Sequence, residues 1–403
     1  MTQPISIAGL AGDGIGHDVF PCAAQMIETV NELVGKKLFE LSPLPYNAEW
    51  YLANGNKPWP DGFEQELMEK FRVMFLIALG DPRVPEGGMA HAKTIILDTG
   101  RTLFDTNFNK RPFFVVHPDT VPQIPKGPFD IELFALNNTQ VRIREERVGV
   151  PGTDSETVYP EDMHNTINFR QLLREAMHRA EERGLTKIIV AHKDNVFNHA
   201  HGRWADVCIE VEAEFNKDKM DPASRISIER QLADSFLERL VRSPQTVPGI
   251  VVTDRAFGSI FEKPFEVLAN GHRGEIPPDL DGVIGRENIE GMYYRRGDSY
   301  TEGKETVGIQ IGRHSRPAIR ENINASIDLA ERRGLFSITV IHLKDIHPES
   351  YHLWREVALE EGKRRAIRIE FMHAGDFVAT AIAAPAQLSH RVFAADNLLG
   401  DLC

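Results

Sequence analysis

The sequence predicts an α/β protein with a mostly parallel sheet, in which part of the scaffold is present twice. Three observations predict this fold class. Short apolar runs that suit buried strands alternate with amphipathic helical patterns. Glycine turns follow the early apolar runs. One long segment recurs further along the chain at a nearly constant offset.

The opening segment predicts a strand, a glycine turn and a helix in that order. Residues 5–9 are apolar, and a helical pattern runs from about 18 to 33. A second apolar run, 71–79, ends at Gly80 and predicts a buried strand. Further on, the same patterns predict strands at 113–117, 131–136, 187–192 and 248–253, and helices at 167–183, 203–216 and 228–241.

The internal repeat is the most informative feature of the chain. Residues 174–193 match residues 324–343 at an offset of 150, and Trp204 matches Trp354 at the same offset. Downstream the offset falls to 142, which fits an insertion near 216–224 in the first copy. A steady offset through strands, helices and tryptophans indicates a duplication.

The repeat divides the chain into four predicted segments. Within the repeats, an offset of 142 makes Asp376 the counterpart of Asp234. We expect the two copies to pack as similar halves, like the two subunits of a dimer. The segments are an N-terminal, large-domain-like segment at 1–127, a first repeat at 128–262, a connector at 263–277 and a second repeat at 278–403.

Composition excludes several classes of partner. The net charge of −13 argues against a nucleic-acid partner, which would need clustered Lys and Arg. No apolar run has membrane-spanning length, and the first residues lack a basic stretch followed by an apolar core. The three cysteines are far apart in sequence and suggest neither a disulfide framework nor a metal site. We therefore expect a cytoplasmic protein, and a homodimer is compatible with this reading.

Several motifs resemble one enzyme family, that of the metal-dependent β-decarboxylating isocitrate and isopropylmalate dehydrogenases. The resemblance covers nearly the whole chain, and its most specific part is an Arg-Glu-Asn motif followed by Glu-Gly and a tyrosine. The motifs are Asn109-Lys110-Arg111-Pro112, His192-Lys193-Asp194-Asn195, Gly285-Arg286-Glu287-Asn288-Ile289-Glu290-Gly291-Met292-Tyr293 and Asn397-Leu398-Leu399-Gly400-Asp401.

The resemblance implies a site for oxidising a 2-hydroxy acid and then removing CO₂ from its C3 carboxylate. It implies Lys193 and Tyr293 as catalytic residues that handle protons. Substrate-binding side chains would be Arg101, Arg111, Arg286 and Asn288. A Mg²⁺ or Mn²⁺ ion would be held by Asp234, Asp376 and Asp401. If NAD(P) is used, it would lie by Gly12, Gly14 and Gly16.

Each copy departs from the family pattern where the other keeps it. The first copy has residues that replace the motif arginine, the tyrosine and two metal aspartates, namely Leu136, Ile143, Ser259 and Lys263. The second copy has Leu343 in place of the lysine. Neither copy is followed by a good match to the loop that holds adenosine in the family. We therefore expect a composite site within one chain and a degraded nicotinamide site.

Three functions stay open from the sequence. The first is metal-dependent decarboxylation of a small β-keto acid with further anionic groups, without hydride transfer. The second is NAD(P)-dependent oxidative decarboxylation of a 2-hydroxy di- or tricarboxylic acid. The third is a non-catalytic or regulatory family member. The residue that reads the C3 substituent would fall in segment 86–100.

Overall fold

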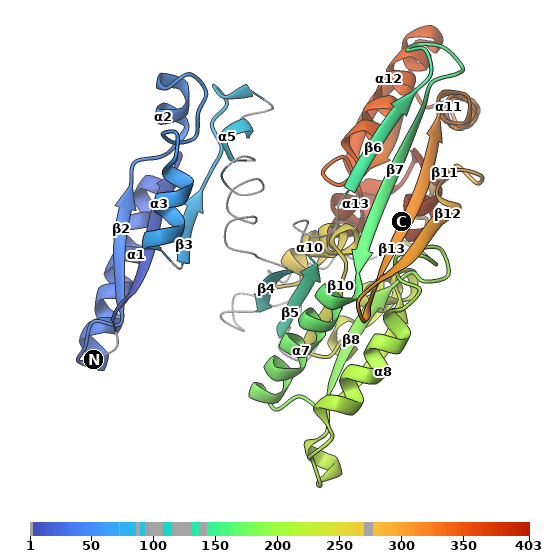
Figure 1. Ribbon diagram of the computed structural model, residues 1–403. Helices are drawn as coiled ribbons and strands as arrows, with labels where there is room; N and C mark the ends of the chain where they lie inside the picture. Colours follow the sequence, from blue (N-terminus) through green and yellow to red (C-terminus); the bar gives the residue numbers. More distant parts are fainter. Residues whose placement is uncertain are drawn as a thin grey trace. The chain divides into compact units, whose positions relative to one another are not determined.

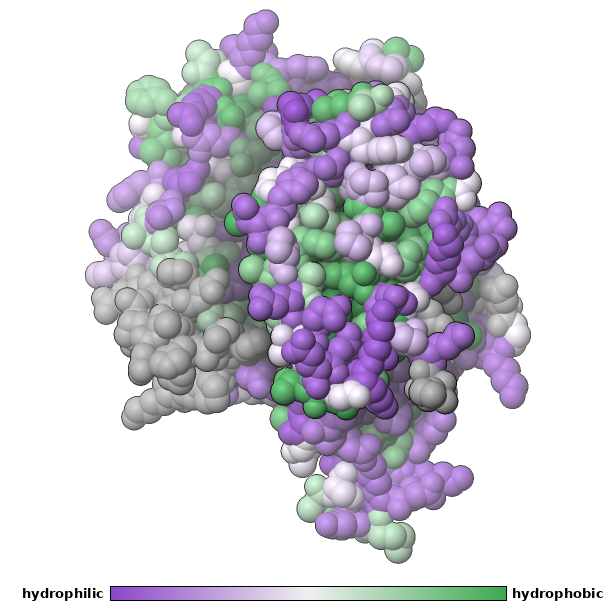
Figure 2. Space-filling model, turned by 90° about the vertical axis from the view of Figure 1, so that its left-hand side faces the viewer, coloured by the Kyte–Doolittle hydropathy of each residue, from purple (hydrophilic) through white to green (hydrophobic). Residues whose placement is uncertain are grey.

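The computed structural model divides the chain into two compact units, Met1–Thr106 and Asn107–Cys403 (Figure 1). Each unit is described by itself. The structure describes residues 3–71, 73–85, 89–92, 95, 108–114, 130–136, 143–269 and 277–403. None of the helices in these ranges is both long and apolar enough to cross a membrane. On the face drawn in Figure 2, hydrophilic and hydrophobic residues are interspersed.

The first unit is a three-stranded sheet with helices. Its elements are β1 (Ile5–Gly12), α1 (Gly16–Val34), β2 (Phe39–Leu44), α2 (Ala48–Ala53), α3 (Phe63–Lys70), β3 (Val73–Ala78) and α5 (Ala90–Ala92). The strands lie in the order β2-β1-β3, and both pairings are parallel. The predicted strands at 5–9 and 71–79 and the helix at 18–33 are confirmed.

The glycine turn after β1 is a structural junction. Gly12 has φ +74°, and a Cβ there would meet the carbonyl oxygen of Ala78 at 1.6 Å, so only glycine fits. The buried carboxylate of Asp13 accepts hydrogen bonds from the backbone N–H of Ala48 at 2.7 Å and of Gly80 at 2.8 Å. Its second oxygen also lies 2.6 Å from Nε2 of His91. The turn thus ties the ends of β1 and β3 to α2.

The first repeat in the second unit has a mainly parallel five-stranded sheet. Its order is β4-β5-β10-β8-β9, with only β4 antiparallel. The elements are β4 (Phe108–Phe114), β5 (Asp130–Leu136), β6 (Ile143–Val148), β7 (Thr157–Asn165), α7 (Thr166–Glu182), β8 (Lys187–His192), α8 (Trp204–Phe215), η3 (Pro222–Ser224), β9 (Ser227–Leu232), α9 (Ala233–Arg242), η4 (Pro244–Thr246), β10 (Ile250–Thr253) and α10 (Arg255–Ala269).

From β5 onward, the second repeat has the same succession of elements as the first except for η3, and its parallel sheet has the same strand order. Its parallel sheet runs β11-β16-β14-β15, which corresponds to β5-β10-β8-β9. The elements are β11 (Gly282–Arg286), β12 (Gly291–Glu302), β13 (Glu305–Ser315), α11 (Arg316–Arg332), β14 (Ser337–His342), α12 (Pro348–Arg365), β15 (Arg368–His373), α13 (Ala374–Ala383), η5 (Pro385–Leu388), β16 (Arg391–Ala395) and α14 (Asn397–Leu402).

Strand residues alternate between two buried faces. In the first repeat, Phe134, Ile188 and Val252 pack in one cluster with residues of α7 and α8. Their neighbours Leu133 and Ile189 belong to a second cluster with residues of α9 and α10. This second cluster also contains residues of α13, α14 and the second repeat's sheet, so the two repeats share one core.

A further sheet joins the repeats and has a self-complementary register. Its order is β12-β13-β7-β6, and β7 pairs antiparallel with β13 (Figure 1). Asn165 lies opposite Val307, and Thr157 lies opposite Ser315. At the offset of 150, Ser315 is the counterpart of Asn165 and Val307 is the counterpart of Thr157. Exchanging the two copies therefore turns one pair into the other, as at an isologous interface.

Two predicted boundaries differ from the structure. The helical pattern at 228–241 is wrong in its first part, because 227–232 form β9, which pairs with β8 in the buried sheet. Sheet pairing here overrides the local periodicity. The connector predicted at 263–277 begins inside α10, which continues to Ala269 because Phe265 and Leu268 are buried in the shared core.

Candidate active site

Lys193 is the centre of an ionic cluster formed by both repeats. It follows β8 directly, and its side chain is buried at 1% exposure. Its Nζ lies 2.9 Å from Oδ2 of Asp234, at the start of α9, and 2.6 Å from Oδ2 of Asp401, in α14. A buried ammonium between two carboxylates is satisfied in charge and in hydrogen bonds. Residues 208 positions apart are thus joined in one chain.

The second repeat supplies the rest of the cluster. Arg286, at the end of β11, donates from Nη1 to Oδ1 of Asp401 at 2.8 Å. The hydroxyl of Tyr293 donates to Oδ2 of the same carboxylate. The Arg286 guanidinium lies 5.1 Å from the centre of the Tyr293 ring. Five predicted site residues therefore meet, with Lys193 and Asp234 from one repeat and the other three from the second.

Asn397 also belongs to this cluster, although its motif did not predict a role for it. Its Oδ1 accepts from Nε of Arg286 at 3.0 Å and from Nη2 at 2.7 Å. It is buried at the first position of α14. Its place four residues before Asp401, one helical turn away, was the available signal. Asn397 fixes the plane of the arginine fork.

Asp401 and Tyr293 influence each other's protonation. Burial raises the pKa of Tyr293, and its hydrogen bond to the Asp401 carboxylate raises it further, so the phenol keeps its proton. Burial alone would raise the pKa of Asp401. The bonds from Lys193 and Tyr293 outweigh burial and hold that pKa below its usual value. The site therefore contains a protonated phenol beside an ionised carboxylate.

Other predicted substrate residues lie elsewhere. Arg111 in β4 forms an ion pair with Glu262 of α10 at 2.5 Å. It does not join Arg286, because β4 extends the first repeat's sheet while Arg286 belongs to the second repeat's sheet. Asn288 is exposed, two residues after β11. Arg101 and the segment 96–100 lie outside the described residues.

The pairing of Asp376 with Asp234 is wrong by one residue. In the sheets, Leu232 lies beside His192 and His373 lies beside His342. The counterpart of Asp234 is therefore Gly375. One residue of shift turns a side chain by about 100° around a helix. The carboxylates of Asp234, Asp376 and Asp401 accordingly do not all lie within 4.8 Å of one another.

The place that the repeat relates to this cluster contains neither its lysine nor the carboxylate of Asp401. Leu343 is buried at 1% exposure where Lys193 stands in the first repeat. Ser259, the counterpart of Asp401, donates to Oδ2 of Asp345 at 2.5 Å. Lys263 bonds Glu266 at 2.8 Å, and this bond raises the pKa of Lys263, with Asp376 adding to the effect.

A buried polar cluster lies behind Lys193. Nδ1 of His201 accepts from the backbone N–H of Lys193 at 3.1 Å, so Nε2 carries the ring proton toward Oδ2 of Asp254 at 3.0 Å. Asp254 also accepts from the N–H of Phe257 at the start of α10. Both nitrogens of His201 are thus used, and we read this cluster as support for the strand end rather than as a metal site. His164 is its third potential ligand.

His164 predicts a loss of stability in mild acid. Burial, aided by the neighbouring His201, lowers its pKa to about 4, whereas an unfolded chain has a value near 6.5. The unfolded state then binds the proton first, so stability falls as pH drops from 6.5 toward 4. Between pH 7 and pH 5 we expect His164 to cost about 2 kcal/mol. Urea unfolding of the wild type and His164→Phe at both pH values measures it. An equal pH dependence in both proteins would contradict this assignment.

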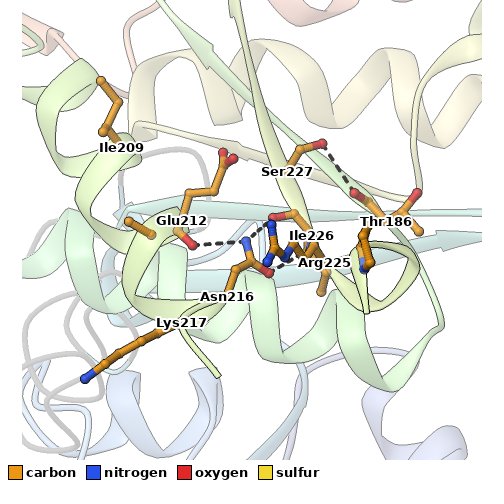
Figure 3. A pocket seen from close by; sticks show the side chains of 10 residues that line it. Thr186, Ile209, Glu212, Asn216, Lys217, Arg225, Ile226 and Ser227 are labelled. Atoms are coloured by element: carbon orange, nitrogen blue, oxygen red, sulfur yellow. Dashed lines mark hydrogen bonds between the residues drawn. The ribbon is translucent and has the colours of Figure 1, made fainter. Parts of the chain in front are cut away.

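A separate cavity of about 730 Å³ lies at the insertion near 216–224 (Figure 3). The cavity lies between α8 and β9. The insertion is held by two hydrogen bonds of the Asn216 side chain: Nδ2 donates to the carbonyl oxygen of Ile226 at 2.8 Å, and Oδ1 accepts from the backbone N–H of Ile226 at 3.0 Å. None of the residues of the ionic cluster lines it. This location indicates that the cavity results from the insertion and is not part of the ionic cluster.

Comparison with known proteins decides the family. The sequence profile described as isocitrate/isopropylmalate dehydrogenase matches residues 6–262 and, separately, 260–403. The chain belongs to this family. The first match covers the N-terminal segment together with the first repeat, and the second match covers the second repeat.

Two relatives and one solved structure illustrate the range of the family. A 3-isopropylmalate dehydrogenase of Thermobifida fusca is 27% identical over 285 residues, which cover 69% of this chain and 76% of the relative. A probable tartrate dehydrogenase/decarboxylase of Agrobacterium vitis is 25% identical over 62% of this chain, and the match spans 66% of that relative. The crystal structure of an isocitrate dehydrogenase from Methylococcus capsulatus has a TM-score of 0.50 and 18% identity, covering 65% of this chain and 70% of that one. The last likeness concerns the fold alone.

Proposed function

We propose that this protein decarboxylates a small β-keto acid with further anionic groups, using a divalent metal and no nicotinamide. The observation that carries the proposal is the contact of Lys193 Nζ with both Asp234 and Asp401, which come from different repeats. Arg286 and Tyr293 bind the same Asp401. We infer that the two repeats act as a fused pair with one retained site.

The carboxylates fit a Mg²⁺ or Mn²⁺ ion. Asp234 and Asp401 both bond the Lys193 ammonium, so the space between them already accepts positive charge. Two carboxylates completed by water and substrate oxygens are a usual ligand set for these hard cations. When bound, such an ion would supply an electron sink at the C2 carbonyl of the substrate. Their side chains, 35% and 22% exposed, leave access for an ion.

The protein's own side chains have distinct tasks in this proposal. Arg286, with its plane fixed by Asn397, would bind a substrate carboxylate through its guanidinium. Lys193 would place its positive charge at the C2 carbonyl oxygen. Tyr293, whose hydroxyl lies beside Asp401 in the cluster, would deliver a proton to C3 after CO₂ departs.

The order of the segments along the sequence favours a reaction without hydride transfer. The glycine turn at 12–16 belongs to a segment that precedes only the first repeat. The retained Arg286, Tyr293 and Asp401 belong to the second repeat, which is preceded by the short stretch between α10 and β11. The close approach of Gly12 to Ala78 and the hydrogen bonds of Asp13 are sufficient to explain this turn without a bound cofactor.

The alternative is NAD(P)-dependent oxidative decarboxylation of a 2-hydroxy di- or tricarboxylic acid. The names of the relatives favour it, since both are dehydrogenases. In that case Lys193 would take the proton of the substrate hydroxyl. The glycine turn would then hold part of the cofactor.

One experiment separates these functions. Candidate 2-keto and 2-hydroxy acids are supplied with Mn²⁺, with and without NAD or NADP, while CO₂ and reduced-nicotinamide absorbance are followed. We expect CO₂ from a keto acid alone, and we expect a chelator to stop its release. CO₂ from the hydroxy acid together with cofactor reduction would show that the alternative is right. Full turnover in excess chelator would refute the role of the metal.

A further inference from the structure

Two buried aspartates occupy equivalent places at the ends of central strands. Asp254 follows β10 and Asp396 follows β16, and the offset of 142 relates them. Oδ1 of each accepts a hydrogen bond of 2.8 Å from a backbone N–H, that of Phe257 for Asp254 and that of Leu399 for Asp396. Each aspartate therefore caps the helix that follows its strand, α10 or α14. The second oxygen of each carboxylate binds a side chain.

The side chain at this second oxygen differs between the repeats. In the second repeat, the hydroxyl of Tyr351 donates to Oδ2 of Asp396 at 2.5 Å. In the first repeat, the counterpart of Tyr351 is His201, whose Nε2 donates to Oδ2 of Asp254 at 3.0 Å. A phenol has one polar atom, whereas an imidazole has a second nitrogen on the other side of its ring. In His201 this second nitrogen accepts the backbone N–H of Lys193 at 3.1 Å.

The imidazole is present in the repeat that keeps the lysine. In the second repeat, where Tyr351 replaces it, Leu343 stands in the place of Lys193. The ring of His201 is also held firmly, because it is fully buried and stacks on Trp204 with ring centres 4.0 Å apart. It therefore offers a fixed acceptor to the main chain at the residue whose side chain enters the cluster.

We propose that His201 is a positioning residue that keeps Lys193 in place when the carboxylates of the cluster bind metal. The inference rests on the proposed function and adds a residue to its machinery. In the structure, Nζ of Lys193 is held by Asp234 and Asp401. These two carboxylates are the proposed ligands of the ion, and their bonds to the ammonium weaken once they serve it. The bond from His201 acts on the main chain of Lys193, so it persists in both states.

Replacing one carboxylate oxygen by an amide nitrogen tests this role. Asp254→Asn keeps the shape of the side chain and the helix cap, but its Nδ2 is a donor toward Nε2 of His201. The imidazole must then carry its proton on Nδ1, which faces the N–H of Lys193 and can no longer accept from it. Asp396→Asn is the matched control, because the hydroxyl of Tyr351 can turn and accept from the new amide.

Two measurements report the result. Hydrogen–deuterium exchange of the Lys193 amide in the metal-free protein should become at least about tenfold faster in Asp254→Asn, since a hydrogen bond slows exchange. With Mn²⁺ and a keto acid present, kcat should fall by about tenfold to a hundredfold because the lysine is displaced, while KM stays within about twofold. His201→Tyr, which installs the side chain of the other repeat, should show the same changes. His201→Gln, whose amide offers one acceptor and one donor, should keep the slow exchange and most of kcat.

The outcomes separate this role from the reaction. Unchanged exchange in both Asp254→Asn and His201→Tyr would show that the bond does not hold Lys193. Equal losses of kcat in Asp254→Asn and Asp396→Asn would show ordinary structural support and overturn the positioning role. Faster exchange with an unchanged kcat would also overturn it and leave the proposed function intact. Absence of CO₂ release from the wild type would remove the proposed function, whereas the exchange of the amide still decides whether His201 holds Lys193.

Discussion

Lys193→Ala is expected to lower kcat for decarboxylation by about 10²–10⁴-fold. The substitution removes the positive charge at the substrate carbonyl and leaves Asp234 and Asp401 facing each other. Initial rates of CO₂ release at saturating substrate measure the effect. Lys263→Ala is the matched control, because Lys263 lies outside the cluster and bonds Glu266, and its rate should stay within about twofold. A Lys193→Ala rate within tenfold of wild type would remove this lysine from the mechanism.

The same variant separates a site within one chain from a site between chains. Tyr293→Phe should also be inactive, since it lacks the proton donor. Mixing it with Lys193→Ala should restore no activity, because both residues bond Asp401 of their own chain. Recovery of CO₂ release on mixing would show that a second chain completes the site.

Arg316→Ala is expected to destabilise the fold by about 3–5 kcal/mol. This arginine, 1% exposed, joins the repeats by donating to Glu156 of the first repeat at 2.7 Å, and it also donates to Glu360 of its own repeat at 2.6 Å. Its loss leaves the buried Glu156 carboxylate with less compensation. Urea unfolding at pH 7 measures the change. Arg203→Ala, whose partner Asp206 is 48% exposed, should cost less than about 1 kcal/mol. A cost below 1 kcal/mol for Arg316→Ala as well would refute a buried role.

Most of the central strands could be predicted from the sequence because a buried strand consists of a continuous run of apolar residues. The run at 187–192 is apolar and ends at His192 beside Lys193, and the structure has β8 at the same residues. The helix at 167–183 is confirmed to within one residue at each end. The strand at 227–232 was missed because a half-buried edge strand carries polar residues, among them Glu229 and Arg230.

The site could be predicted where one copy keeps a family residue that the other copy has lost. It could not be predicted where the answer depends on a one-residue shift in the alignment of the copies. Lys193 and Leu343 differ in sequence, so a composite arrangement followed from comparing the copies. The position of Asp376 did not follow, because η5 has one residue more than η4 and the sequence does not show where that residue enters. The ion pair of Arg111 could not be predicted, since its partner Glu262 is 151 positions away in the sequence.

The self-complementary register of β7 and β13 has a consequence for how the two halves can change over time. In a dimer of identical subunits every substitution appears twice, so a lysine lost from one site is lost from both. In a fused pair, positions 193 and 343 are encoded separately, although the sheet between them retains its matched pairing. Each half can therefore lose a residue that the other keeps, as with Leu343 in the place of Lys193 and Ser259 in the place of Asp401. The residues that the two halves keep meet in one cluster, where Arg286, Tyr293 and Asp401 of the second repeat adjoin Lys193 of the first.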